Sequence, residues 1–286
     1  MTFIMIKPLK PVSFRWGGEF SPTLSGPMNK GISEPLPLPS TIAGFLYSLA
    51  TGGGKRENLG KLSLENESVK VKLWGPILYH RGKYYAHSYP SKLIELDNWE
   101  LKLNEDGKVE EVEATNLLGV INKIGIGMRF DNKTVIESML YTQELIKIEG
   151  GIIVEVEQDV KEGYYTMGGE SSIVKVEPWK FTPPEEGDCG LVISPIILSP
   201  TEKVVSVDDF YDVEIEGCGK LGDKIVEGIP VKIGLIGLGF NIAYNVRRPI
   251  YPAILPGSVL KCNKRGNVGK FTSWGSILPV NCRKSN

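Results

Sequence analysis

A glycine-rich segment near the C-terminus has residue types suited to contacting a nucleic acid. Gly234, Gly237 and Gly239 would let the backbone approach a ligand closely and offer its N–H groups. Arginines can pair with phosphates and aromatic rings can stack on unpaired bases. The glycines alone fit tight strand packing equally well, but the residues that follow favour phosphate and base contacts: Phe240, Asn241, Tyr244, Arg247, Arg248, Tyr251, Ser258 and Lys261.

The same glycines do not predict a nucleotide cofactor. Their spacing is G-x-x-G-x-G, whereas dinucleotide sites use G-x-G-x-x-G at the start of a helix. No acidic residue follows them that could bind a ribose hydroxyl, and the chain has no Walker A sequence. We therefore expect no cofactor.

A second glycine pair lies in the sequence MGGESS, residues 167–172. Gly168 and Gly169 free the backbone, and Ser171 and Ser172 could donate hydrogen bonds to phosphate oxygens. A simple turn explains the same residues about as well.

Two histidines raise the alternative of an enzyme. His80 and His87 flank a predicted turn at residues 81–83, and with Lys83 they could serve a metal-independent ribonuclease. No nucleophile elbow is present, and the acid-free C-terminal segment offers no partner for the pair Asp208-Asp209 in a two-metal centre. Surface histidines are the favoured interpretation, and no catalytic residue is predicted.

The cysteines do not predict a metal site. Cys189, Cys218, Cys262 and Cys282 are far apart in the sequence, without C-x-x-C spacing. We expect four buried or half-buried structural thiols and no bound metal.

Charge is distributed unevenly along the 286 residues, although the net charge is only −1. Residues 228–286 contain nine Lys and Arg but no Asp or Glu, and the first 33 residues contain four basic residues and one acid. The middle of the chain is acidic. Such asymmetry favours a polyanion partner over an ordinary solvated surface.

The composition is that of a globular protein, with 41% hydrophobic residues. No apolar run is long enough to span a bilayer, and no signal peptide is recognisable at the N-terminus. A cytoplasmic protein without membrane contact is the expectation.

The predicted elements are mostly strands. Residues 2–8 form a strand, and residues 11–39 are rich in proline and glycine. A helix with Ser40 or Thr41 as N-cap ends at Gly52–54. Hairpins turn near residues 81–83 and at Asp106-Gly107, and residues 124–157 contain a β-hairpin arm whose polar tip is RFDNKT. A linker at residues 183–188 precedes a second strand-rich half.

This pattern predicts an α+β fold with antiparallel sheets, glycine-rich loops and the arm. The length fits two copies of a ferredoxin-like, RRM-like βαββαβ domain. We predict an N-terminal domain at residues 1–165 and a C-terminal domain at residues 166–286.

Four motifs, in this order, resemble a known family. Residues 37–49 (PLPSTIAGFLYSL) are similar to a helix entry of CRISPR RAMP proteins, and residues 124–142 (IGIGMRFDNKTVIESMLYT) to a stretch ending in M-L-Y-T. MGGESS resembles the G-G-E turn, and residues 247–261 (RRPIYPAILPGSVLK) the R-P-x…A-G-S-V ending. Together they resemble the third subunit of type III-B (Cmr) CRISPR effector complexes, which target RNA.

The resemblance implies two ferredoxin-like domains and a non-catalytic RNA-binding role in antiviral defence. Such a subunit caps the repeat-derived 5′ handle of the guide RNA (crRNA). It also lies beside the first backbone RAMP subunit and the large polymerase/cyclase-like subunit. The alternative within the same superfamily is a repeat-RNA endonuclease that uses His80 or His87.

Charge, glycine loops and resemblance together give the predicted RNA-binding residues: Arg15, Ser40, Thr41, Arg129, Tyr141, Gly168, Gly169, Ser171, Ser172, Asn241, Tyr244, Arg247, Arg248 and Lys261.

Overall fold

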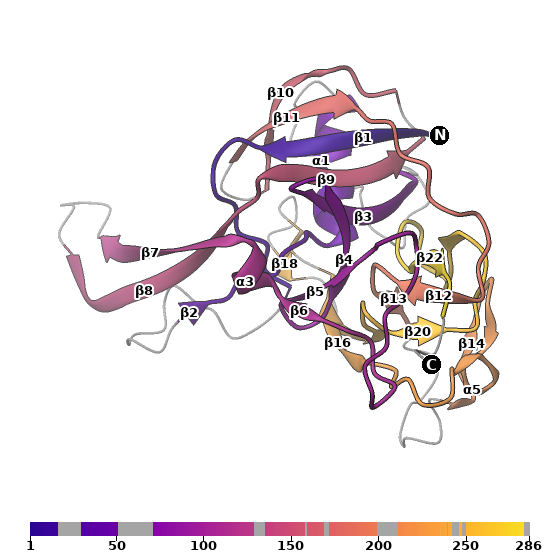
Figure 1. The fold of residues 1–286 in the computed structure, drawn as a ribbon. Helices are drawn as coiled ribbons and strands as arrows, with labels where there is room; N and C mark the ends of the chain where they lie inside the picture. Colours follow the sequence, from indigo (N-terminus) through magenta and orange to yellow (C-terminus); the bar gives the residue numbers. More distant parts are fainter. Residues whose placement is uncertain are drawn as a thin grey trace.

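The computed structural model describes residues 1–16, 30–50, 71–128, 135–157, 159–168, 172–198, 211–238, 240–241, 246–247 and 250–282. Within these ranges antiparallel sheets dominate and helices are few (Figure 1). The predicted α+β class with antiparallel sheets is confirmed.

An eight-stranded antiparallel sheet forms the first half of the molecule, in the order β10-β11-β1-β9-β3-β4-β5-β6. Side chains alternate across it, so on β1 Ile4 and Ile6 face one side and Met5 the other. The strands are β1 (Thr2–Pro8), β3 (Leu73–His80), β4 (Lys83–Ser88), β5 (Lys92–Glu95), β6 (Val112–Glu113), β9 (Gly150–Val156), β10 (Gly163–Met167) and β11 (Ser172–Pro178).

Helix α1 (Pro39–Ala50) covers one face of this sheet. Its Ile42, Phe45 and Leu46 pack against Ile4 and Ile6 in one core. The helix begins at Pro39, whose fixed φ suits a first helical position, so Ser40 and Thr41 lie inside the helix rather than capping it. The N-cap position is Leu38, so the predicted N-cap at Ser40 or Thr41 is wrong by two or three positions.

The predicted hairpin arm is confirmed. Strands β7 (Gly119–Met128) and β8 (Val135–Lys147) pair in antiparallel register and project away from the sheet (Figure 1). The short strand β2 (Lys30–Gly31) runs parallel to β8, and the short helix α3 (Ala114–Leu117) precedes the arm. The predicted tip, residues 129–134, lies outside the described residues.

The C-terminal half contains two further small sheets, ordered β20-β12-β22-β21 and β13-β19-β16, and two two-stranded ribbons. Its elements are β12 (Cys189–Val192), β13 (Ile196–Ile197), β14 (Glu214–Ile215), β15 (Gly219–Lys220), α5 (Leu221–Lys224), β16 (Ile233–Gly237), β17 (Phe240–Asn241), β18 (Val246–Arg247), β19 (Ile250–Ile254), β20 (Val259–Leu260), β21 (Gly266–Asn267) and β22 (Ser276–Val280).

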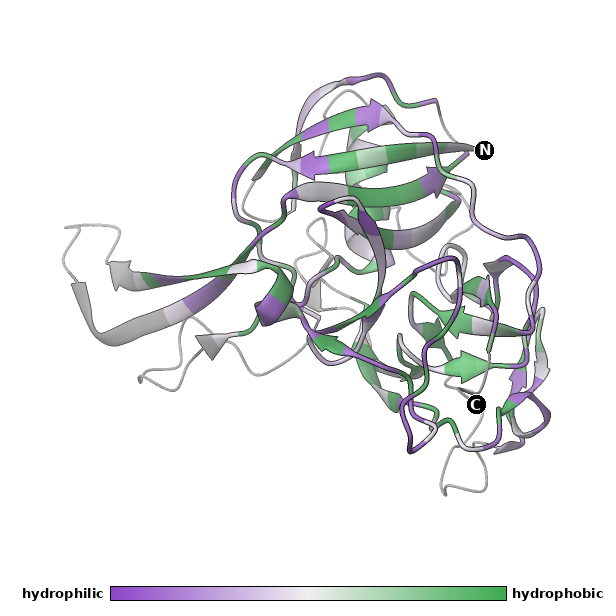
Figure 2. Ribbon diagram, viewed as in Figure 1, coloured by the Kyte–Doolittle hydropathy of each residue, from purple (hydrophilic) through white to green (hydrophobic). Residues whose placement is uncertain are grey.

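The two halves share a hydrophobic core. Met5 and Ile77, on the sheet face opposite α1, lie in one buried cluster with Leu191 and Leu278 of the C-terminal half. The indole N–H of Trp74 donates to the carbonyl of Ile277 at 3.0 Å. Figure 2 shows hydrophobic strand segments in both the upper sheet and the C-terminal half.

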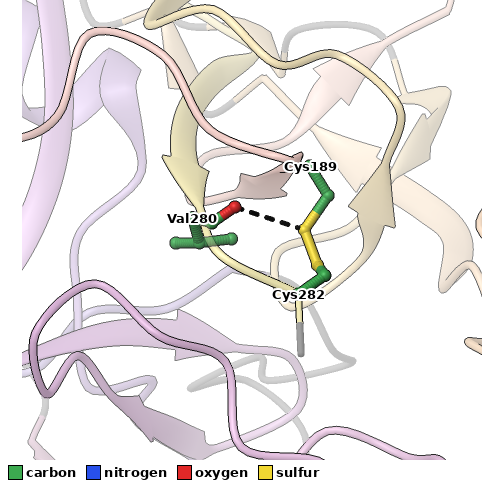
Figure 3. Close-up of a disulfide and its surroundings, with 3 residues drawn as sticks. All are labelled: Cys189, Val280 and Cys282. Atoms are coloured by element: carbon green, nitrogen blue, oxygen red, sulfur yellow. Dashed lines mark hydrogen bonds between the residues drawn. A yellow bond between two sulfur atoms is a disulfide. The ribbon is translucent and has the colours of Figure 1, made fainter. Parts of the chain in front are cut away.

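All four cysteines form disulfides, so the expectation of free structural thiols is wrong. Cys189 bonds to Cys282 and Cys218 to Cys262, across Cα–Cα distances of 6.1 and 5.5 Å. In Figure 3 the sulfur of Cys189 lies 3.6 Å from the carbonyl oxygen of Val280. Because a disulfide sulfur carries no proton, this is a close contact rather than a hydrogen bond.

The described residues form neither a membrane-spanning helix nor a cluster of metal ligands. They contain no helix with the length and apolarity to cross a membrane. They also contain no group of three or more His, Cys, Asp or Glu side chains that could hold a metal ion.

Candidate nucleic-acid interface

A pocket lies where the end of β10, the start of β11, helix α1, the base of the arm and residues 12–15 meet. We call it the β10–β11 pocket. Its walls combine apolar side chains with polar groups from segments far apart in the sequence. The lining residues are Pro8, Val12, Ser13, Phe14, Arg15, Thr41, Gln143, Met167, Gly168, Ser172 and Val174.

Alternation along residues 12–16 gives the pocket part of its polar wall. Val12, Phe14 and Trp16 are buried, whereas Ser13 is half-buried and Arg15 is exposed. Backbone hydrogen bonds fix this segment: Val12 exchanges two with Ile146, at 2.9 and 2.7 Å. Extended backbone of this kind places Ser13 and Arg15 on the same side.

The turn between β10 and β11 forms the opposite rim. Met167 pairs with Ser172 at the last rung of the hairpin, and Gly168 follows with φ +78°, a conformation that glycine adopts readily. No atom lies within 4 Å of the position that a Cβ on Gly168 would occupy. The backbone at Gly168 is therefore open to a ligand.

The pocket suits a ligand with a negative group and a flat apolar part. Among the lining residues that the structure describes, Arg15 is the one cation and none is a carboxylate. Within the described part of the chain the buried hydroxyl oxygen of Ser13 has no hydrogen-bond partner, which leaves a donor and acceptor available at the wall. Phe14, Met167 and Val174 add apolar contact surface. A nucleotide, with its phosphate and planar base, has this combination of groups.

Four of the predicted RNA-binding residues meet here: Arg15, Thr41, Gly168 and Ser172. They come from three segments that are distant in sequence, so their meeting is a result of the fold.

The other predicted residues do not line the pocket. Ser40 is half-buried on α1, and Lys261 is exposed in the C-terminal half. The structure places only the backbone of Tyr141 on β8, Asn241 on β17 and Arg247 on β18. Those outside the described residues are Arg129, Gly169, Ser171, Tyr244 and Arg248.

Two polar lining residues, Ser13 and Gln143, were not predicted from the sequence. Ser13 could have been found from the apolar–polar alternation of residues 12–16. Gln143 is buried in strand β8, and no local pattern marks a glutamine there as part of a pocket. Its position depends on the arm crossing the N-terminal segment.

Gly234, Gly237 and Gly239 were expected either to allow tight strand packing or to let the backbone approach a ligand, and the structure gives a different answer for different glycines. A Cβ on Gly234 would lie 2.8 Å from Leu255, so this glycine serves tight packing in strand β16. Gly237 has open space around it, and Gly239 lies outside the described residues.

The acid-free segment does not present all its charge to solvent. The ammonium group of Lys232 contacts Glu111, and the guanidinium of Arg265 contacts Glu155 and Glu185. Burial alone would lower the pKa of Arg265, but the hydrogen bonds that it donates to its carboxylate partners outweigh burial and raise it. Part of the predicted polyanion surface therefore joins the two halves of the chain.

Both histidines are buried, so the prediction of surface histidines is wrong. His87 Nε2 lies 2.9 Å from the carboxylate of Glu34, beneath the ring of Trp16 at a centroid distance of 4.4 Å. Burial, and then the charge of Arg81, lower the pKa of His80.

Comparison with known proteins decides the family. Over 284 residues the chain is 30% identical to "CRISPR system CMR subunit Cmr3" of Saccharolobus solfataricus, an alignment covering 91% of this chain and 86% of the relative. The chain belongs to the Cmr3 family. The resemblance to the third subunit of type III-B Cmr complexes is thus confirmed. No general family model matches the sequence.

Solved structures agree with the Cmr3 family at the level of fold. One chain of the type III-B Cmr-beta complex bound to cognate target RNA and AMPPnP superposes with a TM-score of 0.62 at 24% identity, covering 90% of this chain and 85% of its own. A chain of the complex bound to cognate target RNA gives 0.61 at 25% identity, covering 90% and 86%.

Proposed function

We propose that this chain is a non-catalytic, RNA-binding subunit of a type III-B Cmr ribonucleoprotein in cytoplasmic antiviral defence. It would hold the 5′ handle of the crRNA, with one nucleotide entering the β10–β11 pocket. The observation that carries this proposal is the meeting of Arg15, Thr41, Gly168 and Ser172 in that pocket of a Cmr3-family chain.

The handle suits such a site chemically. Single-stranded RNA is recognised by splaying its bases onto apolar or aromatic surfaces and holding its phosphates with cations and N–H groups. The exposed Arg15 and the open backbone at Gly168 would take the phosphate. The apolar wall at Phe14 would take the base.

Within the complex, we propose that the chain bridges the large polymerase/cyclase-like subunit to the first backbone RAMP subunit. The projecting arm supports this role, because Ile121 and Ile124 of β7 are exposed along it. The relatives' complexes contain further chains and RNA, which makes assembly contacts of this kind reasonable to propose here.

We also propose two ferredoxin-like domains, close to the predicted ranges 1–165 and 166–286. In the first half the antiparallel order β11-β1-β9-β3, with α1 after β1, supports such a domain. The boundary at residue 165 falls inside β10 (Gly163–Met167), and β11 pairs with β1. We therefore assign β10 and β11 to the first domain.

The buried histidines favour binding over catalysis. His80 and His87 are 1% and 0% exposed, so neither imidazole can reach an RNA 2′-hydroxyl without local opening of the fold. This argues against the repeat-RNA endonuclease alternative.

Charge reversal in the pocket tests the proposal. In a reconstituted complex, Arg15→Glu should weaken retention of crRNA, because it replaces a phosphate-binding cation with an anion. Loss of one phosphate contact should also reduce the log–log salt slope of RNA binding by roughly one. Binding is measured by fluorescence anisotropy with labelled handle RNA across a salt series.

A matched control is Arg81→Glu, which reverses an exposed arginine paired with Glu149 outside the pocket. It should leave RNA affinity nearly unchanged. Equal RNA affinity and salt slope for Arg15→Glu and Arg81→Glu would contradict the handle-binding role.

A further inference from the structure

An apolar patch lies on strands β16 and β19 of the C-terminal half. Its members are Ile233, Leu235, Ile250 and Pro252, which we call the β16–β19 patch. Leu235 is 73% exposed, Ile250 67% and Ile233 44%. Leu235 pairs with Pro252 and Gly237 with Ile250, so these side chains share one face of the sheet. They form a contiguous surface rather than scattered residues.

The rest of this sheet is covered. On the inner face Ile236, Tyr251 and Ala253 are buried in a core with Trp274. On the outer face Ile254 is fully buried, in a cluster that includes Val213, Ile215 and Leu221. The outer face is therefore covered at the Ile254 end and bare at the Leu235 end.

Strand β16 also has a free edge among the described strands. The sheet order is β13-β19-β16, so β16 is bonded to β19 on one side only. An exposed edge with apolar side chains is a template for a further strand. In Figure 2 this strand is coloured largely as hydrophobic, at the lower centre of the molecule where Figure 1 labels β16.

We propose that the β16–β19 patch binds an extended, aliphatic segment of another protein subunit, which adds a strand to the edge of β16. This inference rests on the proposed role as a complex subunit and names one of its contact surfaces. Backbone hydrogen bonds would supply affinity, and contacts with Leu235 and Ile250 would select apolar side chains at alternate positions of the incoming segment.

Chemistry favours a protein segment over RNA. The patch side chains are aliphatic, so they offer neither an aromatic ring for base stacking nor a cation for phosphate. A contiguous exposed apolar surface is instead a common feature of protein-contact sites.

Size and charge disfavour a second copy of the same chain. A standard interface involves about 20–30 residues on each partner, whereas this patch consists of four side chains. A two-fold contact would also bring two acid-free segments together, because residues 228–286 contain no Asp or Glu. The incoming segment is thus expected to carry acidic rather than basic residues at its ends.

Photo-crosslinking in the complete complex tests the proposal. A benzophenone amino acid replaces Leu235 in a complex reconstituted from its own subunits and crRNA, and the matched control replaces Tyr164, which is 68% exposed on β10. We expect an adduct between residue 235 and an extended aliphatic segment of one other protein subunit. An adduct with RNA, an adduct with a second copy of this chain, or no adduct above the Tyr164 control would each overturn the proposal.

A variant separates this surface from the RNA site. Leu235→Asp with Ile250→Asp should lower retention of the crosslinked subunit about tenfold while handle RNA affinity stays within about twofold of wild type. Arg15→Glu should show the reverse pattern. If the double variant does not fold, Leu235→Ser replaces it, with the same expected direction. Unchanged subunit retention in a folded variant would refute the strand-addition contact.

Discussion

The ammonium nitrogen of Lys232 lies 2.5 Å from a carboxylate oxygen of Glu111. Lys232 also donates to the hydroxyl of Ser88 at 2.7 Å and to the carbonyl of Tyr89 at 2.9 Å. Three groups from the first half thus surround one cation from the acid-free C-terminal segment. The pair fixes the position of the two halves relative to each other, because both partners are largely shielded from solvent.

Replacing Lys232 with methionine should destabilise the protein by about 2–3 kcal/mol, because the partly buried Glu111 carboxylate would lose its principal cation. Urea denaturation at neutral pH measures the change. Lys102→Met is the control, since Lys102 lies 3.8 Å from Asp97 in an exposed pair and should cost under about 0.5 kcal/mol. A similar decrease in the free energy of unfolding in both variants would contradict a larger contribution from the Lys232–Glu111 contact.

The same contact predicts an acid-sensitive stability. Burial alone would raise the pKa of Glu111, but hydrogen bonds from Lys232 and Ser88 outweigh burial and lower it. A lowered folded pKa stabilises the protein above the unfolded value of 4.5, and this contribution disappears as the pH falls through the folded pKa. The free energy of unfolding should therefore decrease below about pH 4.5 in wild type, with a smaller decrease in Lys232→Met.

Ser13→Ala should separate stability from RNA binding. Its buried hydroxyl has no partner among the described residues, so its removal should leave folding unchanged or slightly more favourable. If the hydroxyl bonds to RNA, handle affinity should fall about two- to tenfold. Ser48→Ala is the control, because the Ser48 hydroxyl donates to the carbonyl of Phe45 in α1. A stability loss in Ser13→Ala without any change in RNA affinity would contradict the pocket's role.

The sequence predicted those strands, helices and turns that depend on residues close together in the chain. Alternating residues gave β1, glycines after an apolar helical stripe gave α1, and the long alternating stretch gave the arm. The turn between β3 and β4 was predicted correctly at Arg81-Gly82, where both residues have positive φ. The predicted hairpin at Asp106-Gly107 is only partly formed, with one isolated β-bridge between Leu103 and Val109.

The candidate site was only partly predictable, because its residues are brought together by contacts between segments that are distant in the sequence. Arg15, Gly168 and Ser172 were identified by residue type, but their meeting depends on β11 pairing with β1 in the sheet. The burial of His87 depends on Glu34, 53 residues earlier in the chain. No local pattern contains such distances.

The disulfides should contribute measurably to the stability of the C-terminal half. Pairing of β12 with β22 brings Cys189 near Cys282, which is 93 residues away, and the second bridge closes a separation of 44 residues. Loops of this length correspond to about 2–5 kcal/mol for each bridge. Cys218→Ser with Cys262→Ser should lower the unfolding free energy by about that amount.

Alkylation checks that the bridges form. The protein unfolded without reductant should show no free thiol, and reductant should lower its melting temperature. The control is a variant with all four cysteines changed to serine, whose melting temperature should not respond to reductant. Alkylation of all four cysteines in the native protein would contradict the presence of the two bridges.

His80 should make stability depend on pH near neutrality. Burial and the charge of Arg81 lower its folded pKa below the unfolded value of 6.5, so the unfolded chain binds more protons between the two values. The free energy of unfolding should therefore decrease as the pH falls from 6.5 to the folded pKa, by about 1.4 kcal/mol for each pH unit between the two. His80→Asn should remove this component, and Arg81→Met should shrink it because the imidazole pKa would rise. Chemical denaturation from pH 5 to 8, with NMR titration of the His80 ring, measures both effects. An unchanged pH profile in His80→Asn, or cleavage of repeat RNA that this variant abolishes, would contradict a purely structural His80.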